Sequence, residues 1–230
     1  MKIINDNILI SEYSIFEEYL KRNWSWILIN TVNCEWFMGK WLALEFKIRF
    51  WSDYFFDYEN KCNNKKIKVW NIDYYSKDNL KIINFPTKDL YKLESKLVWI
   101  EDWLNDLIKK IENWLFNNEI IYIPKLWSSQ WWLKWEEVYL VIKDKLLNIK
   151  NSKVKFIICE DTEAWDIEKA ILNKLKDYTW NKIWDKTLNN IKDNFYKIKR
   201  LRNLLSIKWV WEKTYNEILK MWNMKELKLF

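Results

Sequence analysis

A single glycine in 230 residues is the feature that most restricts how this chain can fold. About 16 glycines would be expected in a chain of this length at ordinary usage. Tight turns and helix C-termini need positive φ angles, which glycine adopts far more readily than other residues. The same sequence contains 19 tryptophans. Many of these tryptophans could therefore stand where the backbone requires glycine.

The positions of the tryptophans favour this explanation. Several adjoin an asparagine, and glycine in their place would give the Asn-Gly or Gly-Asn pairs that mark turns. These pairs are Asn23-Trp24, Trp70-Asn71, Asn113-Trp114, Trp180-Asn181 and Trp222-Asn223. Trp114 also closes an amphipathic run, at the place where a helix often has a C′ glycine.

The composition suggests how glycine could have become tryptophan. Lys, Asn and Ile are abundant while Ala, Pro and Arg are scarce, which indicates an A+T-rich genome. Some bacterial lineages use the stop codon UGA for glycine, and translation of UGA as tryptophan would give this pattern. We therefore predict that most of the tryptophans are glycine in the natural protein. The alternative is a tryptophan-rich core or an aromatic binding surface.

Absent and scattered residue types exclude several kinds of site. The chain has no histidine, which rules out histidine bases, histidine-containing triads and histidine-ligated zinc. Cys34, Cys62 and Cys159 form no metal-binding pattern, and their odd number fits a reducing cytoplasm. The start of the chain has no signal-peptide pattern, and no apolar run approaches a membrane span. We expect a cytoplasmic protein without a metal, a cofactor or a membrane contact.

Short β-branched runs alternate with helical periodicity over the first 160 residues. Strands are expected at 2–5, 26–33, 80–85, 118–124 and 154–160, and helices at 14–22, 42–50, 96–115 and 135–148. This alternation predicts a three-layer α/β/α domain with a mixed, largely parallel sheet. A charged connecting segment is expected at 161–185. Residues 186–230 should form a small all-α region, with a long basic helix at 186–205 and a second helix at about 213–221.

Two stretches that follow predicted strands become glycine-rich loops if their tryptophans are glycine. The first contains Trp36 and Trp41, and the second contains Trp127, Trp131 and Trp132. Backbone N–H groups in such loops, together with a helix N-terminus, bind anionic groups, and two neighbouring loops suit a diphosphate. Ligands of parallel sheets bind beyond the carboxyl ends of the strands, where both loops should lie.

Three motifs in this order resemble macrodomains, in particular the branch that contains the DarG antitoxins and related ADP-ribosyl hydrolases. They are "NTVNCEWFMGKWLALEFK" at 30–47, "IINFPTK" at 82–88 and "IPKLWSSQWWLKWEEV" at 123–138. The resemblance covers about residues 1–160. It implies a macrodomain fold that binds ADP-ribose, and a hydrolase that removes ADP-ribose from a modified substrate.

The resemblance also assigns roles to individual positions. Asn33, paired with Asn30, would bond the distal ribose hydroxyls, and Lys88 would be the catalytic nucleophile. Either Asp6 or Asn7 would hold the adenine amino group. The first loop would wrap the distal ribose and one phosphate, and the second would cover the diphosphate: Trp36, Phe37, Met38, Gly39, Lys40 and Trp41, then Trp127, Ser128, Ser129, Gln130, Trp131 and Trp132.

The nucleophile, the second loop and two of the tryptophans need further comment. A nucleophilic lysine must be neutral when it attacks, so the pKa of Lys88 must be lowered; otherwise Lys88 is a surface lysine. Some lysine-type relatives have a catalytic aspartate in the second loop. This loop has none, and its absence is usual in the DarG-like branch. Trp135 matches a family tryptophan and should be genuine, whereas Trp99 is ambiguous.

The charge of the chain is concentrated near its C-terminus. Residues 181–230 contain 12 Lys+Arg and 5 Asp+Glu, whereas the first 180 residues contain 27 of each. With glycine at 209 and 211, "LLSIKWVWEKTYNEILK" at 204–220 resembles a helix-hairpin-helix, which implies DNA binding. The candidate nucleic-acid residues are Lys197, Lys199, Arg200, Arg202, Lys208, Trp209, Trp211 and Lys213. The alternatives are a solvated basic tail or a hairpin that is structural or binds protein.

Together these features predict a hydrolase that removes ADP-ribose from modified nucleic acid, with a DNA-modifying toxin as a candidate partner. Two alternatives use the same fold: a module that binds ADP-ribose without cleaving it, and a hydrolase of ADP-ribosylated protein.

Overall fold

The computed structural model divides the chain into two units, residues 1–162 and 163–230, and each unit is described by itself. No helix among the described residues is long and apolar enough to cross a membrane. The structure describes residues 2–21, 26–39, 41–50, 53–113, 115–116, 118–125, 133–149, 153–162, 168–169, 172–173, 175 and 185–221.

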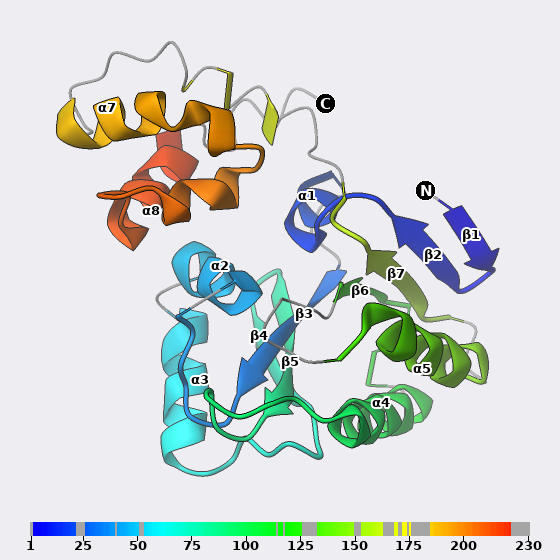
Figure 1. Cartoon of the computed structure of the whole chain (residues 1–230). Coiled ribbons are helices and arrows are strands. Elements are labelled where there is room, and N and C mark those ends of the chain that lie inside the picture. Colours follow the sequence, from blue (N-terminus) through cyan, green and yellow to red (C-terminus); the bar gives the residue numbers. More distant parts are fainter. Residues whose placement is uncertain are drawn as a thin grey trace. The chain divides into compact units, whose positions relative to one another are not determined.

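The first unit is built on a seven-stranded sheet, counted over the described residues, with the order β1-β2-β7-β6-β3-β5-β4 (Figure 1). The strands are β1 (Lys2–Asn5), β2 (Ile8–Ser11), β3 (Trp26–Asn33), β4 (Asp73–Lys77), β5 (Leu80–Lys88), β6 (Ile120–Pro124) and β7 (Lys155–Cys159). The five central strands are parallel, and β1 and β4 pair antiparallel at the two edges. β3 and β5 are buried almost throughout because both faces of the sheet are covered.

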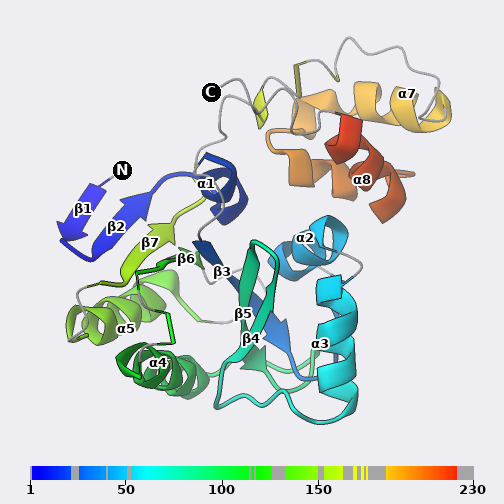
Figure 2. The same cartoon turned by 180° about the vertical axis from the view of Figure 1, so that it is seen from behind.

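Helices cover both faces of this sheet (Figures 1 and 2). On one face are α1 (Ile15–Lys21), α2 (Trp41–Arg49) and α3 (Asp53–Asn63), and on the other are α4 (Leu97–Glu112) and α5 (Trp135–Leu147). Ser14 and Glu17 form a reciprocal capping box at the start of α1. Five apolar side chains of α4 recur at helical spacing and are buried against the sheet: Ile100, Trp103, Leu104, Leu107 and Ile111.

This architecture confirms the predicted three-layer α/β fold with a mixed, largely parallel sheet. Three elements were not predicted from the sequence: β2, β4 and α3. β2 has only four residues, and β4 is a polar edge strand. α3 is polar on average, yet it buries Tyr54, Phe55, Tyr58 and Cys62. β4 and α3 therefore lack the apolar run on which the prediction depended, whereas β2 carries a run of only three apolar residues.

Several tryptophans occupy positions that suit glycine. Trp36 and Trp209 have φ angles of 60° and 73°, in the left-handed region that bulky residues avoid. Leu115 N–H donates to the carbonyl of Lys110 (3.1 Å). This is the 6→1 bond of a Schellman motif, and its C′ position, usually glycine, falls at position 114. Residue 114 itself lies outside the described residues.

The other tryptophans whose side chains are described differ in burial: Trp26 and Trp135 are partly buried against the core, and Trp99 is half-buried. Trp70 and Trp211 are 60% and 67% exposed. Trp103 is different: it is completely buried in α4, and its ring stacks on Phe85 with centroids 3.7 Å apart. A tryptophan-rich core therefore does not account for the exposed tryptophans at positions 36, 70, 209 and 211.

The second unit contains α7 (Asp185–Asp193), two 3₁₀ turns, η1 (Phe195–Lys197) and η2 (Leu201–Ser206), and α8 (Glu212–Met221). The predicted helix at 186–205 was wrong, because α7 ends at Asp193. Asn203 Oδ1 accepts the backbone N–H groups of Lys199 and Arg200 (3.1 and 2.8 Å), which starts a new turn instead. The second predicted helix is confirmed as α8. The connecting segment lies largely outside the described residues.

Candidate active site

Two predicted site residues meet at the carboxyl edge of the sheet. β3 and β5 are parallel neighbours, and Asn33 at the end of β3 pairs in register with Lys88 at the end of β5. The register shifts between Val32 and Asn33, so a bulge turns the chain out of the sheet at this point. Ligands of parallel sheets bind at this edge, and Lys88, which is half-buried, is positioned to meet one.

The side chain of Asn33 organises the loop that follows β3. Its Nδ2 donates to the carbonyl of Phe37 (2.6 Å), and its Oδ1 accepts the backbone N–H groups of Glu35 (2.9 Å) and Phe37 (3.2 Å). Trp36 lies inside this turn with its positive φ. Met38 is buried and Gly39 is exposed at the end of the turn. The contact of Asn33 with ribose hydroxyls stays a prediction.

A chain of buried polar side chains lies beneath the two strand ends. Asn30 Nδ2 donates to the Tyr54 hydroxyl (2.7 Å), which donates to Asn84 Oδ1 (2.5 Å). Asn84 Nδ2 then donates to Asp73 Oδ2 (3.0 Å). Asn30 therefore ties β3 to α3 and β5. Its Oδ1 is buried without a hydrogen-bond partner among the described residues.

The electrostatics of Lys88 fit the requirement for a neutral amine. Burial is the main cause that lowers the pKa of Lys88, and the Glu94 carboxylate opposes this effect in part. A lysine with a lowered pKa has a larger neutral fraction near pH 7 and is a better nucleophile.

The nearby thiol of Cys34 does not offer an alternative nucleophile. Burial, and to a lesser extent Asp89 and Cys62, raise the pKa of Cys34 to about 12. A thiol with this pKa stays protonated at neutral pH, and the thiolate is the reactive form. The structure therefore favours Lys88 over Cys34 for nucleophilic chemistry.

The predicted diphosphate-binding part of the site, which is the end of the first loop and the second loop, is only partly described. Lys40 and residues 127–132 lie outside the described residues, and Trp41 is the first residue of α2. Lys125 follows β6 at the same edge of the sheet and was not among the residues predicted from the sequence. Burial lowers the pKa of Lys125, opposed by Glu160, Glu136 and Asp161. The position of Lys125 just before the second glycine-rich loop could have identified it from the sequence as a candidate site residue.

The structure corrects the expected position of the adenine contact. Asp6 and Asn7 lie in the turn between β1 and β2, at the amino end of β2. β2 runs parallel to β7, β6, β3 and β5. This turn therefore lies at the amino ends of these strands, whereas Lys88 lies at their carboxyl ends. Asp6 and Asn7 are therefore separated from the other site residues.

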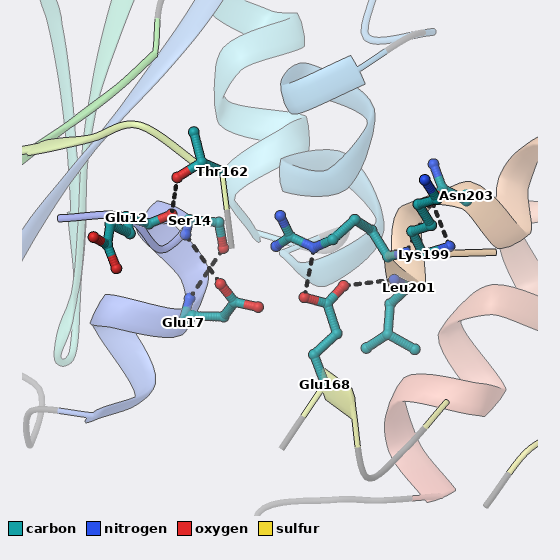
Figure 3. A network of polar contacts seen from close by, with 9 residues as sticks. Glu12, Ser14, Glu17, Thr162, Glu168, Lys199, Leu201 and Asn203 are labelled. Carbon is teal, nitrogen blue, oxygen red and sulfur yellow. Dashed lines mark hydrogen bonds and ion pairs between the residues drawn. The ribbon is translucent and has the colours of Figure 1, made fainter. Parts of the chain in front are cut away.

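Glu12 follows β2 directly and therefore lies at the carboxyl ends of the parallel strands. Its backbone carbonyl accepts the Thr162 N–H (2.8 Å), and its carboxylate is exposed at the start of the turn into α1 (Figure 3). Glu12 was not predicted from the sequence because β2 was not recognised as a strand.

In the second unit, the hairpin between η2 and α8 is held by α7. Thr187 Oγ1 donates to the carbonyl of Trp209 (3.3 Å), and Asn190 Nδ2 donates to that of Lys208 (3.4 Å). Val210 is buried between the two exposed tryptophans of the hairpin. The lysines among the candidate nucleic-acid residues are all exposed: Lys197, Lys199, Lys208 and Lys213.

The two arginine candidates are less accessible. Arg200 Nε donates to Glu168 Oε2 (2.8 Å), and the other oxygen of Glu168 accepts the Leu201 N–H (2.5 Å; Figure 3). Arg202 is half-buried. Arg200 thus fixes the start of η2.

Comparison with known proteins supports the macrodomain interpretation, although no protein-family model matches the chain. A DNA ADP-ribosyl glycohydrolase of Mycobacterium tuberculosis is 39% identical over 115 residues, which are 48% of this chain and 32% of that protein. One from Thermus aquaticus is 31% identical over 131 residues, 55% of this chain and 36% of that protein. The match thus spans about a third of the length of each relative.

Solved structures are similar over most of the chain. The macrodomain of Thermus aquaticus DarG has a TM-score of 0.57 and 27% identity, and the match covers 66% of this chain and 97% of that chain. A Thermosipho africanus DarTG structure in complex with ADP-ribose has a TM-score of 0.58 at 19% identity, covering 73% of this chain and 45% of that chain. The seven-stranded sheet of the first unit, with helices on both faces, is a macrodomain fold.

Proposed function

We propose that this protein is an ADP-ribosyl hydrolase that acts on modified DNA, with Lys88 as the nucleophile. The observation that carries the proposal is a half-buried lysine of lowered pKa opposite Asn33, at the ligand-binding edge of a macrodomain fold. The names of the curated relatives, DNA ADP-ribosyl glycohydrolase, support DNA as the carrier.

In this reaction the neutral amine of Lys88 attacks the anomeric carbon of the distal ribose. The bond from that carbon to the base nitrogen breaks, its electron pair passes to the base, and the base takes up a proton. Water then attacks the same carbon and releases ADP-ribose from Lys88. A water-poor setting favours the first step because it keeps the amine neutral.

The ADP-ribose would lie across the carboxyl edge of the sheet. The turn organised by Asn33 is the proposed ribose contact, and Asn30 supports it from within the sheet. Glu12 is proposed to hold the adenine amino group in place of Asp6 or Asn7. The two loops reach the diphosphate only if their tryptophans are glycine, because indoles would occupy the space the phosphate needs. We therefore include the UGA-to-glycine assignment in the proposal.

The test compares two substrates with one protein. The glycine form, which is the full chain with glycine at positions 36, 41, 127, 131, 132, 209 and 211, is incubated with ADP-ribosylated DNA and with ADP-ribosylated protein. Release of ADP-ribose from DNA at a kcat/KM at least about 100-fold higher is expected. Faster release from protein would contradict DNA as the substrate. Tight ADP-ribose binding without release from either would identify a non-catalytic binding module.

We further propose that the second unit is a helix-hairpin-helix that binds DNA backbone phosphates. The exposed Lys208 and Lys213 flank the hairpin, and the positive φ of Trp209 fits the first glycine of such a motif. A toxin that modifies DNA remains the candidate partner, and the name DarTG of one structural neighbour supports that context.

Replacing Lys208 and Lys213 together with alanine in the glycine form is expected to weaken DNA binding. The slope of log K against log salt concentration should fall by about 2, because two phosphate contacts are lost. Fluorescence anisotropy over a salt range of about 50 to 200 mM measures this slope. Lys2→Ala, on the edge strand β1, is the control. An unchanged slope would mean that the hairpin is structural or binds protein.

A further inference from the structure

The rim of the candidate active site exposes two aromatic side chains that the proposed chemistry does not use. Phe37 is 44% exposed and Tyr91 is 40% exposed. Phe37 lies in the loop that follows β3, and Tyr91 lies three residues after Lys88. Their rings pack together with centroids 4.4 Å apart and planes at 36°. Both residues are present whether or not the tryptophans are glycine.

The two loops that carry these rings are fixed to each other. Cys34 N–H donates to the carbonyl of Asp89 (2.9 Å), and Tyr91 N–H donates to Glu35 Oε2 (2.9 Å). Phe37 is held further by the two hydrogen bonds between its backbone and Asn33. The aromatic pair is therefore positioned by the same residues that organise the ends of β3 and β5.

Gly39 lies directly against the tip of the Phe37 ring. A Cβ at position 39 would lie 2.5 Å from the Phe37 ring, closer than carbon atoms approach without a clash. The one glycine of the sequence thus makes room for an exposed ring. Phe37 and Tyr91 thus form an exposed aromatic pair at the ends of β3 and β5.

The chemistry of the rim suits a single nucleobase. Every base has a flat π-face that stacks on aromatic rings. The ammonium group of Lys92 lies 5.4 Å from the Tyr91 ring centre and can meet a phosphate next to a stacked base. The carboxylates of Glu35, Asp89 and Glu94 are also in these loops and would repel a longer run of backbone phosphates. Enzymes that act on a base inside DNA take it out of the stack.

We propose that Phe37 and Tyr91 form the subsite for the nucleobase that carries the ADP-ribose, taken out of its stack and placed beside Lys88. This inference rests on the proposed function, because it assumes that the ADP-ribose is attached to a base. It adds the means by which the enzyme would distinguish modified DNA from free ADP-ribose and from modified protein.

The test uses Tyr91→Ala and Phe37→Ala in the glycine form. On an ADP-ribosylated single-stranded oligonucleotide, each variant should raise KM about 5- to 100-fold, the loss expected when one stacking ring is removed. For Tyr91→Ala the Kd for free ADP-ribose should change less than about twofold, because Tyr91 is outside the loop that is expected to wrap the ribose and its ring contacts only the base. Tyr91→Phe should restore the parent KM, and Phe56→Ala, which removes an exposed ring on α3, should leave it unchanged.

Three results would overturn the base subsite. They are an unchanged KM on the oligonucleotide, an equal loss of ADP-ribose affinity, and an equal effect on an ADP-ribosylated peptide. Tyr91→Ala covers the case in which Phe37→Ala disturbs the loop, because Tyr91 contributes to the loop contacts through its backbone N–H. If the parent shows no turnover, the hydrolase proposal fails, and the Kd for the uncleaved ADP-ribosylated oligonucleotide then tests the subsite by itself.

Discussion

Lys88→Ala is expected to lower turnover of ADP-ribosylated DNA by at least about a thousandfold, as removal of a catalytic nucleophile commonly does. Binding of ADP-ribose should change little, because the proposed ribose and phosphate contacts come from other residues. The variant should fold normally, since burial already disfavours the charged amine at this position. Turnover is measured under single-turnover conditions, and ADP-ribose affinity by calorimetry.

The pH dependence of the parent gives a second measure of the same group. Only the neutral amine attacks, so the rate should rise with pH through the pKa of Lys88 and then level off. Because burial lowers this pKa, the plateau should begin at a lower pH than an ordinary lysine, with a pKa of about 10.4, would give.

Two further variants complete this test. Lys88→Arg keeps the charge but cannot act as a neutral amine, and it should be as inactive as Lys88→Ala. Lys2→Ala, on the far edge strand, should keep full turnover. Retained turnover in Lys88→Ala would remove Lys88 from the mechanism, even if ADP-ribose release from DNA is established.

Trp103→Gly is expected to lower the free energy of unfolding by about 3–5 kcal/mol. Its ring is completely buried in α4 and stacks on Phe85, so glycine would leave a large cavity and weaken the helix. The loss is limited because the indole Nε1 is buried without a hydrogen-bond partner among the described residues. Urea unfolding of the full chain measures the change.

Trp36→Gly and Trp209→Gly are the matched comparison, and they should have the opposite sign. Both tryptophans hold positive φ angles, which cost a non-glycine residue about 1–3 kcal/mol. Glycine releases this strain but loses more chain entropy, so a net gain of about 0.5–2 kcal/mol is expected. The codons should sort in the same way, with UGA at 36 and 209 and the ordinary tryptophan codon at 103. Destabilisation by both replacements would contradict the glycine assignment.

The sequence predicted those parts of the fold whose residues are apolar on both faces. β3 and β5 are such strands, and they carry Asn33 and Lys88 to one edge. The short β2 gave no comparable signal, and its omission placed the adenine contact in the turn of Asp6 and Asn7. A strand of four residues therefore decides which turn lies at the carboxyl ends of the strands, because it sets which end of the sheet each turn reaches.

Contacts between distant segments were beyond the sequence patterns. The helix expected at 186–205 ends early because Asn203 and Glu168 bind backbone N–H groups at the start of η2, and neither interaction leaves a periodic signal. The pairing of Phe37 with Tyr91 likewise depends on the alignment of β3 with β5. An asparagine at position 33 can bond either to its own loop or to a ligand. The residue type alone could not show that Asn33 bonds to its own loop.

The ion pair between Arg200 and Glu168 shows why the number of basic residues in the sequence differs from the number that can contact DNA. The formal charge counts every basic residue of the sequence. DNA interacts only with the basic side chains that are exposed on the folded protein. Arg200 directs its charge inside the second unit, where its side chain is 13% exposed. Four exposed lysines are left among the described candidates, and if these four alone contact DNA, counterion release should correspond to about four phosphates, with a slope of about 3.6 in magnitude.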